Sequence, residues 1–243
     1  MVQTDTIYNE DCLKTMARME DGSIDLVLTS PPYDNLREYN GYSFDFPAIA
    51  SELHRVTKPD SIVVWVVGDA VIKGSETGSS FRQALHFKDL GFKLHDTMIF
   101  EKNSPAYPAR ANSNRYTQIF EYMFILAKGK VPNQLICDKP NKWAGFKDFS
   151  GKLKNPVPEF SPRNNIWKFT TSFNGVKHPA PFPEALAIDH IRSWSGGVAI
   201  VYDPFMGSGT TAVAAIKLGR KYIGSEISDE YCEIIKNRIG AMK

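Results

Sequence analysis

The chain has 243 residues, a net charge of +2 at pH 7 and 42% hydrophobic residues, which is ordinary for a globular protein with one sizeable α/β core. No apolar run approaches the roughly 20 residues that a membrane span needs, and the polar start MVQTDTIYNED is unlike a signal peptide. The three cysteines form no CxxC and the five histidines form no HxxxH pair. We therefore expect a cytoplasmic protein with no disulfide, no bound metal and no membrane partner.

Strand and helix signals alternate along the chain. In chain order, they predict a strand over 6–10, a helix over 12–20, a buried strand over 25–30, a helix over 46–60, a strand over 61–69, a helix over 79–90 and strands over 93–102 and 117–128. Periodicity is lost over 129–168, and then returns as a helix over 181–194, a strand over 196–203, a small-residue helix from about 210, a strand over 221–227 and a helix that Ser228 caps. This alternation predicts an α/β fold with a Rossmann-like, mostly parallel sheet and helices on both faces.

The aperiodic segment is also the basic one. Residues 128–168 contain nine Lys or Arg and three Asp or Glu, a balance of 9 − 3 = +6, so the rest of the chain carries 2 − 6 = −4. Such a segment is either a solvated surface excursion or a surface that faces a polyanion. Its aromatic residues suit nucleic acid or a small local core, and we expect most of them to be core: Trp143, Phe146, Phe149, Phe160 and Trp167.

The first informative motif is TSPPYDNLREY, residues 29–39. An apolar strand ends there in two prolines and an aromatic residue. Proline fixes φ and has no N–H, so this corner presents carbonyl acceptors and a ring in a rigid frame. The alternative is a rigid surface corner with a packed tyrosine.

The second motif is VYDPFMGSGTTAVAA, residues 201–215, which predicts a strand, a glycine turn and a helix. Glycines allow close backbone approach, and a helix N-terminus offers N–H groups to an anion. The ending of a P-loop is absent, and Glu226 follows Gly209 by 17 residues, about where nucleotide-binding folds place an acid on ribose hydroxyls. A ligand with a carboxylate and a ribose, such as S-adenosylmethionine, suits this pocket better than a pyrophosphate; a plain strand–turn–helix corner is the alternative.

Four motifs in this order, TSPPY, HPAPFPEAL, DPFMGSGTT and YIGSEISDEYCEI, resemble the β-class, permuted amino DNA methyltransferases. In that family the catalytic motif precedes the cofactor motif, and a variable target-recognition region lies between them. The resemblance covers essentially the whole chain except 129–168. It implies S-adenosyl-L-methionine as cofactor, double-stranded DNA as substrate and a circularly permuted class I methyltransferase fold. Its parts would be a catalytic half (1–128), a target-recognition insert (129–168) and a cofactor-binding half (169–243).

The resemblance also implies roles for individual residues. The catalytic loop is Ser30, Pro31, Pro32 and Tyr33. The cofactor-binding residues are Asp11, Cys12, His178, Pro179, Asp203, Phe205, Gly207, Ser208, Gly209, Thr210, Thr211 and Glu226. Candidates for contacts with DNA, taken from the residues themselves and with ordinary surface positions as the alternative, are Arg37, Arg110, Arg115, Lys142 and Lys147.

The implied reaction is methyl transfer to the exocyclic amino group of a base that has left the duplex. Tyr33 would stack on the base, while the Ser30 side chain and the Pro31 carbonyl accept its amino protons. Many family members carry Asp at position 30, and Ser is associated with cytosine N4, so we predict cytosine N4 with adenine N6 as the alternative. Transfer to a ring carbon is disfavoured because it needs a cysteine nucleophile, and no cysteine lies by the loop.

Two other functions and two further partners are alternatives. An RNA amino methyltransferase and an inactive, methyltransferase-like DNA-binding subunit are less favoured alternatives. A homodimer, common in the resembled family, and a separate cognate restriction endonuclease are further candidate partners.

Overall fold

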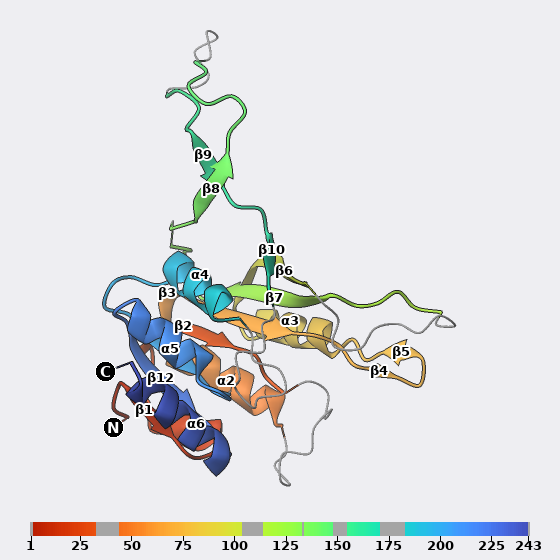
Figure 1. The fold of residues 1–243 in the computed structure, drawn as a ribbon. Coiled ribbons are helices and arrows are strands. Elements are labelled where there is room, and N and C mark those ends of the chain that lie inside the picture. Colours follow the sequence, from red (N-terminus) through yellow and green to blue (C-terminus); the bar gives the residue numbers. More distant parts are fainter. Residues whose placement is uncertain are drawn as a thin grey trace.

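The computed structural model describes residues 2–32, 44–103, 114–132, 134–147, 155–170 and 183–242. Its centre is an eight-stranded sheet in the order β1-β12-β11-β2-β3-β7-β6-β10 (Figure 1). In that order the strands are β1 (Thr6–Tyr8), β12 (Lys221–Ser225), β11 (Ile200–Asp203), β2 (Ile24–Thr29), β3 (Thr57–Val67), β7 (Phe120–Ala127), β6 (Lys93–Lys102) and β10 (Ile166–Phe169). β7 runs antiparallel to both neighbours, and the other neighbouring pairs are parallel.

Helices cover both faces of this sheet (Figure 1). They are α1 (Cys12–Met16), α2 (Phe46–Val56), α3 (Ser79–Asp89), α4 (Glu184–Trp194), α5 (Thr210–Lys217) and α6 (Asp229–Gly240). One apolar cluster lies between the sheet and α4, α5 and α6, and a second lies between the sheet and α1, α2 and α3. Because strand side chains alternate, Val64 and Val66 of β3 join the first cluster while Val63 and Trp65 join the second. The predicted Rossmann-like α/β fold is confirmed.

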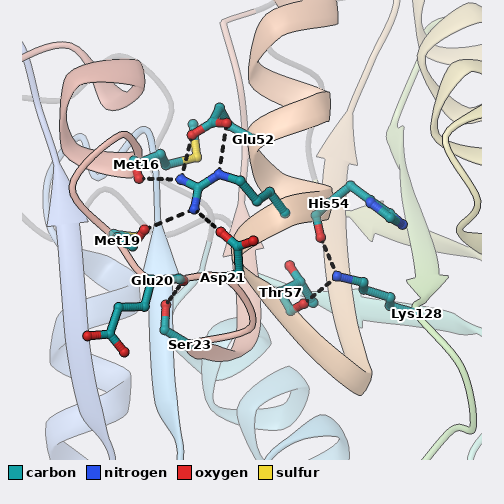
Figure 2. A network of polar contacts seen from close by, with 10 residues as sticks. Met16, Met19, Glu20, Asp21, Ser23, Glu52, His54, Thr57 and Lys128 are labelled. Atoms are coloured by element: carbon teal, nitrogen blue, oxygen red, sulfur yellow. Dashed lines mark hydrogen bonds and ion pairs between the residues drawn. The ribbon is translucent and has the colours of Figure 1, made fainter.

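Polar contacts fix α2 on the second face (Figure 2). The guanidinium of Arg55 donates to the carbonyl oxygens of Met16 (2.7 Å) and Met19 (2.9 Å), at and just beyond the end of α1. Lys128, directly after β7, donates to the carbonyl oxygens of His54 and Thr57 (2.8 Å for Thr57), where α2 passes into β3. These bonds tie α2 to the end of α1 and to Lys128 beyond β7, so α2 is held in position on this face of the sheet.

A hairpin projects from the body beside α4 (Figure 1). It is formed by β8 (Cys137–Pro140) and β9 (Phe160–Pro162), and we call the described part of residues 137–162 the arm. Arg163, at its base, donates to Asp138 of β8 (2.9 Å) and to Asp189 of α4 (2.7 Å). The arm therefore lies within the predicted insert, whose range also includes most of β10, a strand of the main sheet.

The expectation that most aromatic residues of this segment form a local core is wrong. Trp143 is 70% exposed, and Phe146 and Phe160 are also exposed, whereas Trp167 of β10 is buried. A two-stranded hairpin has no second layer on which to bury its side chains, while β10 lies beneath α4. Phe149 lies outside the described residues. A second small hairpin, β4 (Val71–Ile72) with β5 (Ser75–Glu76), follows β3.

None of the helices in the described ranges is long and apolar enough to cross a membrane.

Candidate active site

Four chain segments meet at the carboxyl edge of the parallel strands. Ser30, Pro31 and Pro32 follow β2, the glycine loop follows β11, Glu226 follows β12, and Asp11 lies just beyond β1. The four strands are neighbours in the order β1-β12-β11-β2. Ligands of open α/β sheets bind at this edge. The fold therefore brings together the segments predicted from the start and from the end of the sequence.

A buried carboxylate, that of Asp203, joins the end of β2 to the glycine loop. One oxygen of Asp203 accepts hydrogen bonds from the Thr29 hydroxyl (2.6 Å) and the Phe205 N–H (3.0 Å), and the other accepts from the Thr211 hydroxyl (2.7 Å). Burial raises the pKa of Asp203 to about 6, although the hydrogen bonds from Thr29, Thr211 and Phe205 oppose this change. Asp203 thus holds the loop from behind, and its charge is matched by three donors.

The glycine loop leads into α5 with an open helix end. Gly207 and Gly209 have positive φ values of 53° and 82°, which residues other than glycine rarely adopt. Gly209 is the N-cap of α5, and no side chain caps that end. The backbone N–H groups there can bind an anion. A Cβ at Gly209 would lie 2.9 Å from Cγ2 of Ile235 in α6, so the loop and α6 are closely packed.

Glu226 is tied to the same loop. Its two oxygens accept from the backbone N–H groups of Gly207 (2.8 Å) and Ser228 (2.9 Å), and its own N–H donates to the Tyr8 carbonyl (3.0 Å). Burial raises the pKa of Glu226, against the effect of those backbone hydrogen bonds. A carboxylate has about four lone-pair sites, so the bonds from the loop backbone leave acceptor capacity for a ligand hydroxyl.

Asp11 and Cys12 lie at the start of α1. Asp11 is the N-cap of this helix, and its side chain accepts from the Leu13 N–H (2.8 Å). Burial, aided by the negative charge of Asp11, raises the pKa of the Cys12 thiol to about 12, so the thiol is uncharged at neutral pH. The Tyr202 hydroxyl, within electrostatic reach of both residues, hydrogen-bonds Ser225 (2.9 Å). Asp11 and Cys12 thus lie at the end of the site next to β1.

The segment predicted to be catalytic follows β2, next to the end of β11. Pro31 is buried, and Ser30 and Pro32 are partly buried. Phe205 of the glycine loop packs against two aromatic rings. Its ring centroid lies 5.7 Å from that of Phe44 and 6.3 Å from that of Trp65. Several of the predicted site residues lie outside the described residues, namely Tyr33, Arg37, Arg110, His178 and Pro179.

The remaining loop residues and the DNA candidates are placed as follows. Ser208, Thr210 and Thr211 are buried in the loop and the first turn of α5, and Ser208 accepts from Arg238 of α6 (3.2 Å). Arg115 contacts the β4–β5 hairpin through Glu76 (3.7 Å) and the Gly74 carbonyl. Lys142 and Lys147 are exposed, and the arm that carries them projects from the body beside α4 (Figure 1).

Three polar residues at this edge were not predicted from the sequence. Thr29 donates a hydrogen bond to Asp203. The feature of the sequence that could have indicated it is a hydroxyl residue at the end of an apolar strand. Lys102 ends β6 and forms a 2.5 Å ion pair with Glu121 of β7. That pair can be found only from strand register, because 19 residues separate the two positions in the chain.

The donor set of the loop suits S-adenosylmethionine. An uncapped helix N-terminus for a carboxylate lies beside a buried acid with free lone pairs for ribose hydroxyls. Among the described residues, no group of three or more His, Cys, Asp or Glu is placed to hold a metal ion.

Comparisons with known proteins show a family for this chain. The model of the N6_N4_Mtase family, described as DNA methylase, matches residues 24–237. The orphan methyltransferase M.BamHII of Bacillus amyloliquefaciens is 55% identical over 240 residues, with 90% of this chain and 89% of the relative covered. The type II methyltransferase M.BglII of Bacillus subtilis is 29% identical, with 94% of this chain and 67% of the relative covered.

Two solved structures share the fold. The PvuII DNA methyltransferase, named as cytosine-N4-specific, has a TM-score of 0.75 at 24% identity and covers 98% of this chain and 87% of its own. A putative DNA modification methylase of Thermus thermophilus, complexed with S-adenosyl-L-methionine, has a TM-score of 0.67 at 26% identity and covers 97% of this chain and 94% of its own.

Proposed function

Because this chain belongs to the N6/N4 family of S-adenosylmethionine-dependent DNA methyltransferases, we propose that it methylates the exocyclic amino group of one base in a specific duplex site, with cytosine N4 as the target. The observation that carries the proposal is the hydrogen bond of 2.6 Å between Thr29 and Asp203. It fixes the residue before the Ser30–Pro32 segment to the last residue of β11, directly before the loop that would hold the cofactor.

The cofactor supplies an electrophilic methyl group when it is bound. The N-terminus of α5 would bind its carboxylate, and Glu226 would accept from its ribose hydroxyls. Asp203 would act from behind by holding the loop backbone, since its oxygens already accept three hydrogen bonds.

The amino group of a base is a weak nucleophile because its lone pair is delocalised into the ring. The Ser30 side chain and the Pro31 carbonyl would accept its two protons, which localises the lone pair and directs it at the methyl group. The base must leave the duplex for this to happen, and Tyr33 would stack on its face with about 1–3 kcal/mol.

The preference for cytosine rests on Ser30, where many members of the resembled family carry Asp. Adenine N6 is the second candidate for the target base. The likeness to the PvuII enzyme concerns the fold, so it does not decide between the two bases.

We place target reading on the arm, whose exposed lysines and Trp143 suit a polyanion with stacked bases. A homodimer and a cognate restriction endonuclease are proposed partners only. The relative M.BamHII is named an orphan methyltransferase, which favours action without an endonuclease. Sedimentation of the protein with and without duplex DNA tests the dimer.

The test of the target base uses purified protein, labelled S-adenosylmethionine and mixed-sequence duplex DNA, followed by digestion to nucleosides and mass spectrometry. We expect N4-methylcytosine. N6-methyladenine would keep the mechanism and change the base. A DNA digest without a labelled nucleoside, with or without transfer to RNA in a parallel reaction, would contradict the proposal.

A further inference from the structure

One row of side chains at the carboxyl edge has polar members that the proposed mechanism does not use. On the face of the sheet that α4 and α5 cover, one row of apolar side chains lies nearest the carboxyl edge of the parallel strands. It consists of Leu28, Val66, Met123 and Phe100. Strand side chains alternate, so the residues two positions nearer this edge face the same side. They are Ser30 after β2, Gly68 after β3, Glu121 on β7 and Lys102 on β6.

Strand register places this row in space. Val67 pairs with Tyr122 across β3 and β7, so Gly68 and Glu121 follow as the next facing positions. Glu121 itself pairs with Phe100 across β7 and β6. Two strand spacings, about 10 Å, therefore separate the strand that ends at Ser30 from the strand that carries Glu121.

The floor between the two sides is open in the described part of the chain. A Cβ built on Gly68 would meet Cγ of Glu121 at 3.8 Å, and it would meet no other heavy atom of the described residues within 4 Å. A larger residue than glycine would fill this space. The row thus has an acceptor-bearing segment on one side, a bare backbone in the middle and an ion pair on the other side.

The ion pair is well placed to meet a ligand. The side chains of Lys102 and Glu121 are 21% and 12% exposed, and the ammonium nitrogen lies 2.5 Å from a carboxylate oxygen. An ammonium group has three N–H donors, so donors remain beyond the one that Glu121 takes. A largely buried ion pair contributes little net stability, because desolvation of the two charges offsets their attraction.

A flipped base creates a need for such a donor. The ring nitrogen beside the amino group, N3 of cytosine or N1 of adenine, is an acceptor that loses its partner when the base leaves the duplex. The prolines of the catalytic segment have no N–H to give it. Leaving that acceptor unpaired in the site would weaken binding of the base.

We propose that Lys102, held in place by Glu121, donates a hydrogen bond to this ring nitrogen and so fixes the base with its amino group towards Ser30. Lys102 is then a substrate-binding residue and Glu121 a positioning residue. The ion pair has no net charge as a unit. It therefore supplies a hydrogen-bond donor without a net positive charge, which would make the amino group a weaker nucleophile. This inference rests on the proposed function and extends it to the far wall of the base pocket.

The test compares normal duplex with duplex whose target base is the deaza analogue, 3-deazacytosine or 1-deazaadenine, which keeps the amino group and lacks the ring acceptor. The target sequence is first read from DNA that the wild type has methylated. Single-turnover transfer is measured for the wild type, Lys102→Met, Lys102→Arg and Glu121→Gln. The intrinsic difference between the two bases is the same for every variant, so it cancels in the ratio of rates.

Two variants serve as matched controls. Glu101→Gln breaks the ion pair with Lys168 (2.7 Å), on the opposite face of β6 from Lys102. Lys58→Met breaks the ion pair with Asp25 (2.6 Å), at the opposite edge of the sheet from Lys102. We expect the controls to behave as the wild type. Binding of S-adenosylmethionine, measured by titration calorimetry, should be unchanged in all variants, which verifies that they are folded.

We expect Lys102→Met to slow transfer to the normal base by about 10- to 100-fold and to lose the discrimination against the deaza base. Lys102→Arg should restore part of both, and Glu121→Gln should lie between. Equal slowing on both bases, or unchanged rates, would overturn this inference alone. Absence of transfer to DNA by the wild type would overturn the proposed function and this inference with it.

Discussion

Thr29 and Asp203 are 174 residues apart in the chain and share a buried hydrogen bond of 2.6 Å. The bond joins the end of β2 to the end of β11, two adjacent parallel strands. Together with the bond from the Thr211 hydroxyl to the Leu28 carbonyl (3.4 Å), it holds the end of β2 against the glycine loop.

Asp203→Asn should remove a pH dependence of stability. The pKa of Asp203 is about 6 in the folded chain and near 3.8 when unfolded, so the folded state binds the proton more tightly. Stability therefore falls as pH rises from about 4 to about 6, by on the order of 3 kcal/mol, and the loss is complete above that window. Asn has no such titration, and both threonine hydroxyls can reorient to pair with its amide.

Thermal melting of the wild type and Asp203→Asn between pH 4 and pH 7.5 checks this prediction. As pH rises, the unfolding free energy of the wild type should fall relative to that of Asp203→Asn. A constant difference across the range would mean that the carboxyl group has an ordinary pKa.

Gly209→Ala should damage both stability and cofactor binding. Its positive φ of 82° strains an alanine by about 1–2 kcal/mol, and the contact with Ile235 adds about 1–3 kcal/mol of overpacking. Gly219→Ala is the matched control, since Gly219 also has a positive φ (69°) but has no described atom within 4 Å of the added Cβ. Chemical denaturation and calorimetric titration of S-adenosylmethionine measure the two effects, and an equal loss in both variants would mean that packing against α6 is unimportant.

Glu226→Gln should weaken S-adenosylmethionine binding and alter its pH dependence. Gln replaces one acceptor oxygen by an NH₂ group that would face the N–H of Gly207 or Ser228, so the affinity should fall by about 10-fold or more. Burial raises the pKa of Glu226, so protonation should weaken binding to the wild type at a higher pH than for an ordinary glutamate. Titrations from pH 5 to pH 8 check this, and the same pH profile in both proteins would exclude Glu226 from the cofactor site.

The double substitution Lys142→Ala/Lys147→Ala should weaken DNA binding through lost phosphate contacts. Each contact contributes about 0.9 to the slope of log K against log salt concentration, so the slope should fall by about 2. Lys217→Ala/Lys236→Ala, with two exposed lysines on α5 and α6, is the charge-matched control. Fluorescence anisotropy with duplex DNA at several salt concentrations measures the slopes. Equal slopes in the two double variants would show that the arm does not contact the backbone.

Periodicity predicts the body of the fold well because each element is long and patterned. The strand expected over 93–102 forms β6 over the same range, and the helix expected over 79–90 is α3. The helix expected over 46–60 ends earlier, at Val56, because β3 begins at Thr57 and pairs with Ile24. Strand pairing that depends on distant partners thus outweighs a local signal.

The rest of the site is beyond sequence reasoning because it depends on contacts between distant segments. The motifs place the glycine loop and Glu226, but the bonds from Glu226 to Gly207 and Ser228 follow from loop geometry. The hairpin arm and β10 read as one aperiodic segment, since strands of three or four residues leave too short a pattern.

The most direct test of the proposed catalytic loop concerns Tyr33, which lies outside the described residues. Tyr33→Ala is compared with the wild type for S-adenosylmethionine affinity by calorimetry and for single-turnover methyl transfer to duplex DNA. We expect an affinity within about 3-fold of the wild type and a transfer rate lower by about 100-fold, because loss of stacking misplaces the base. Loss of cofactor binding together with transfer would make the tyrosine structural, and an unchanged transfer rate would contradict the catalytic role of this loop.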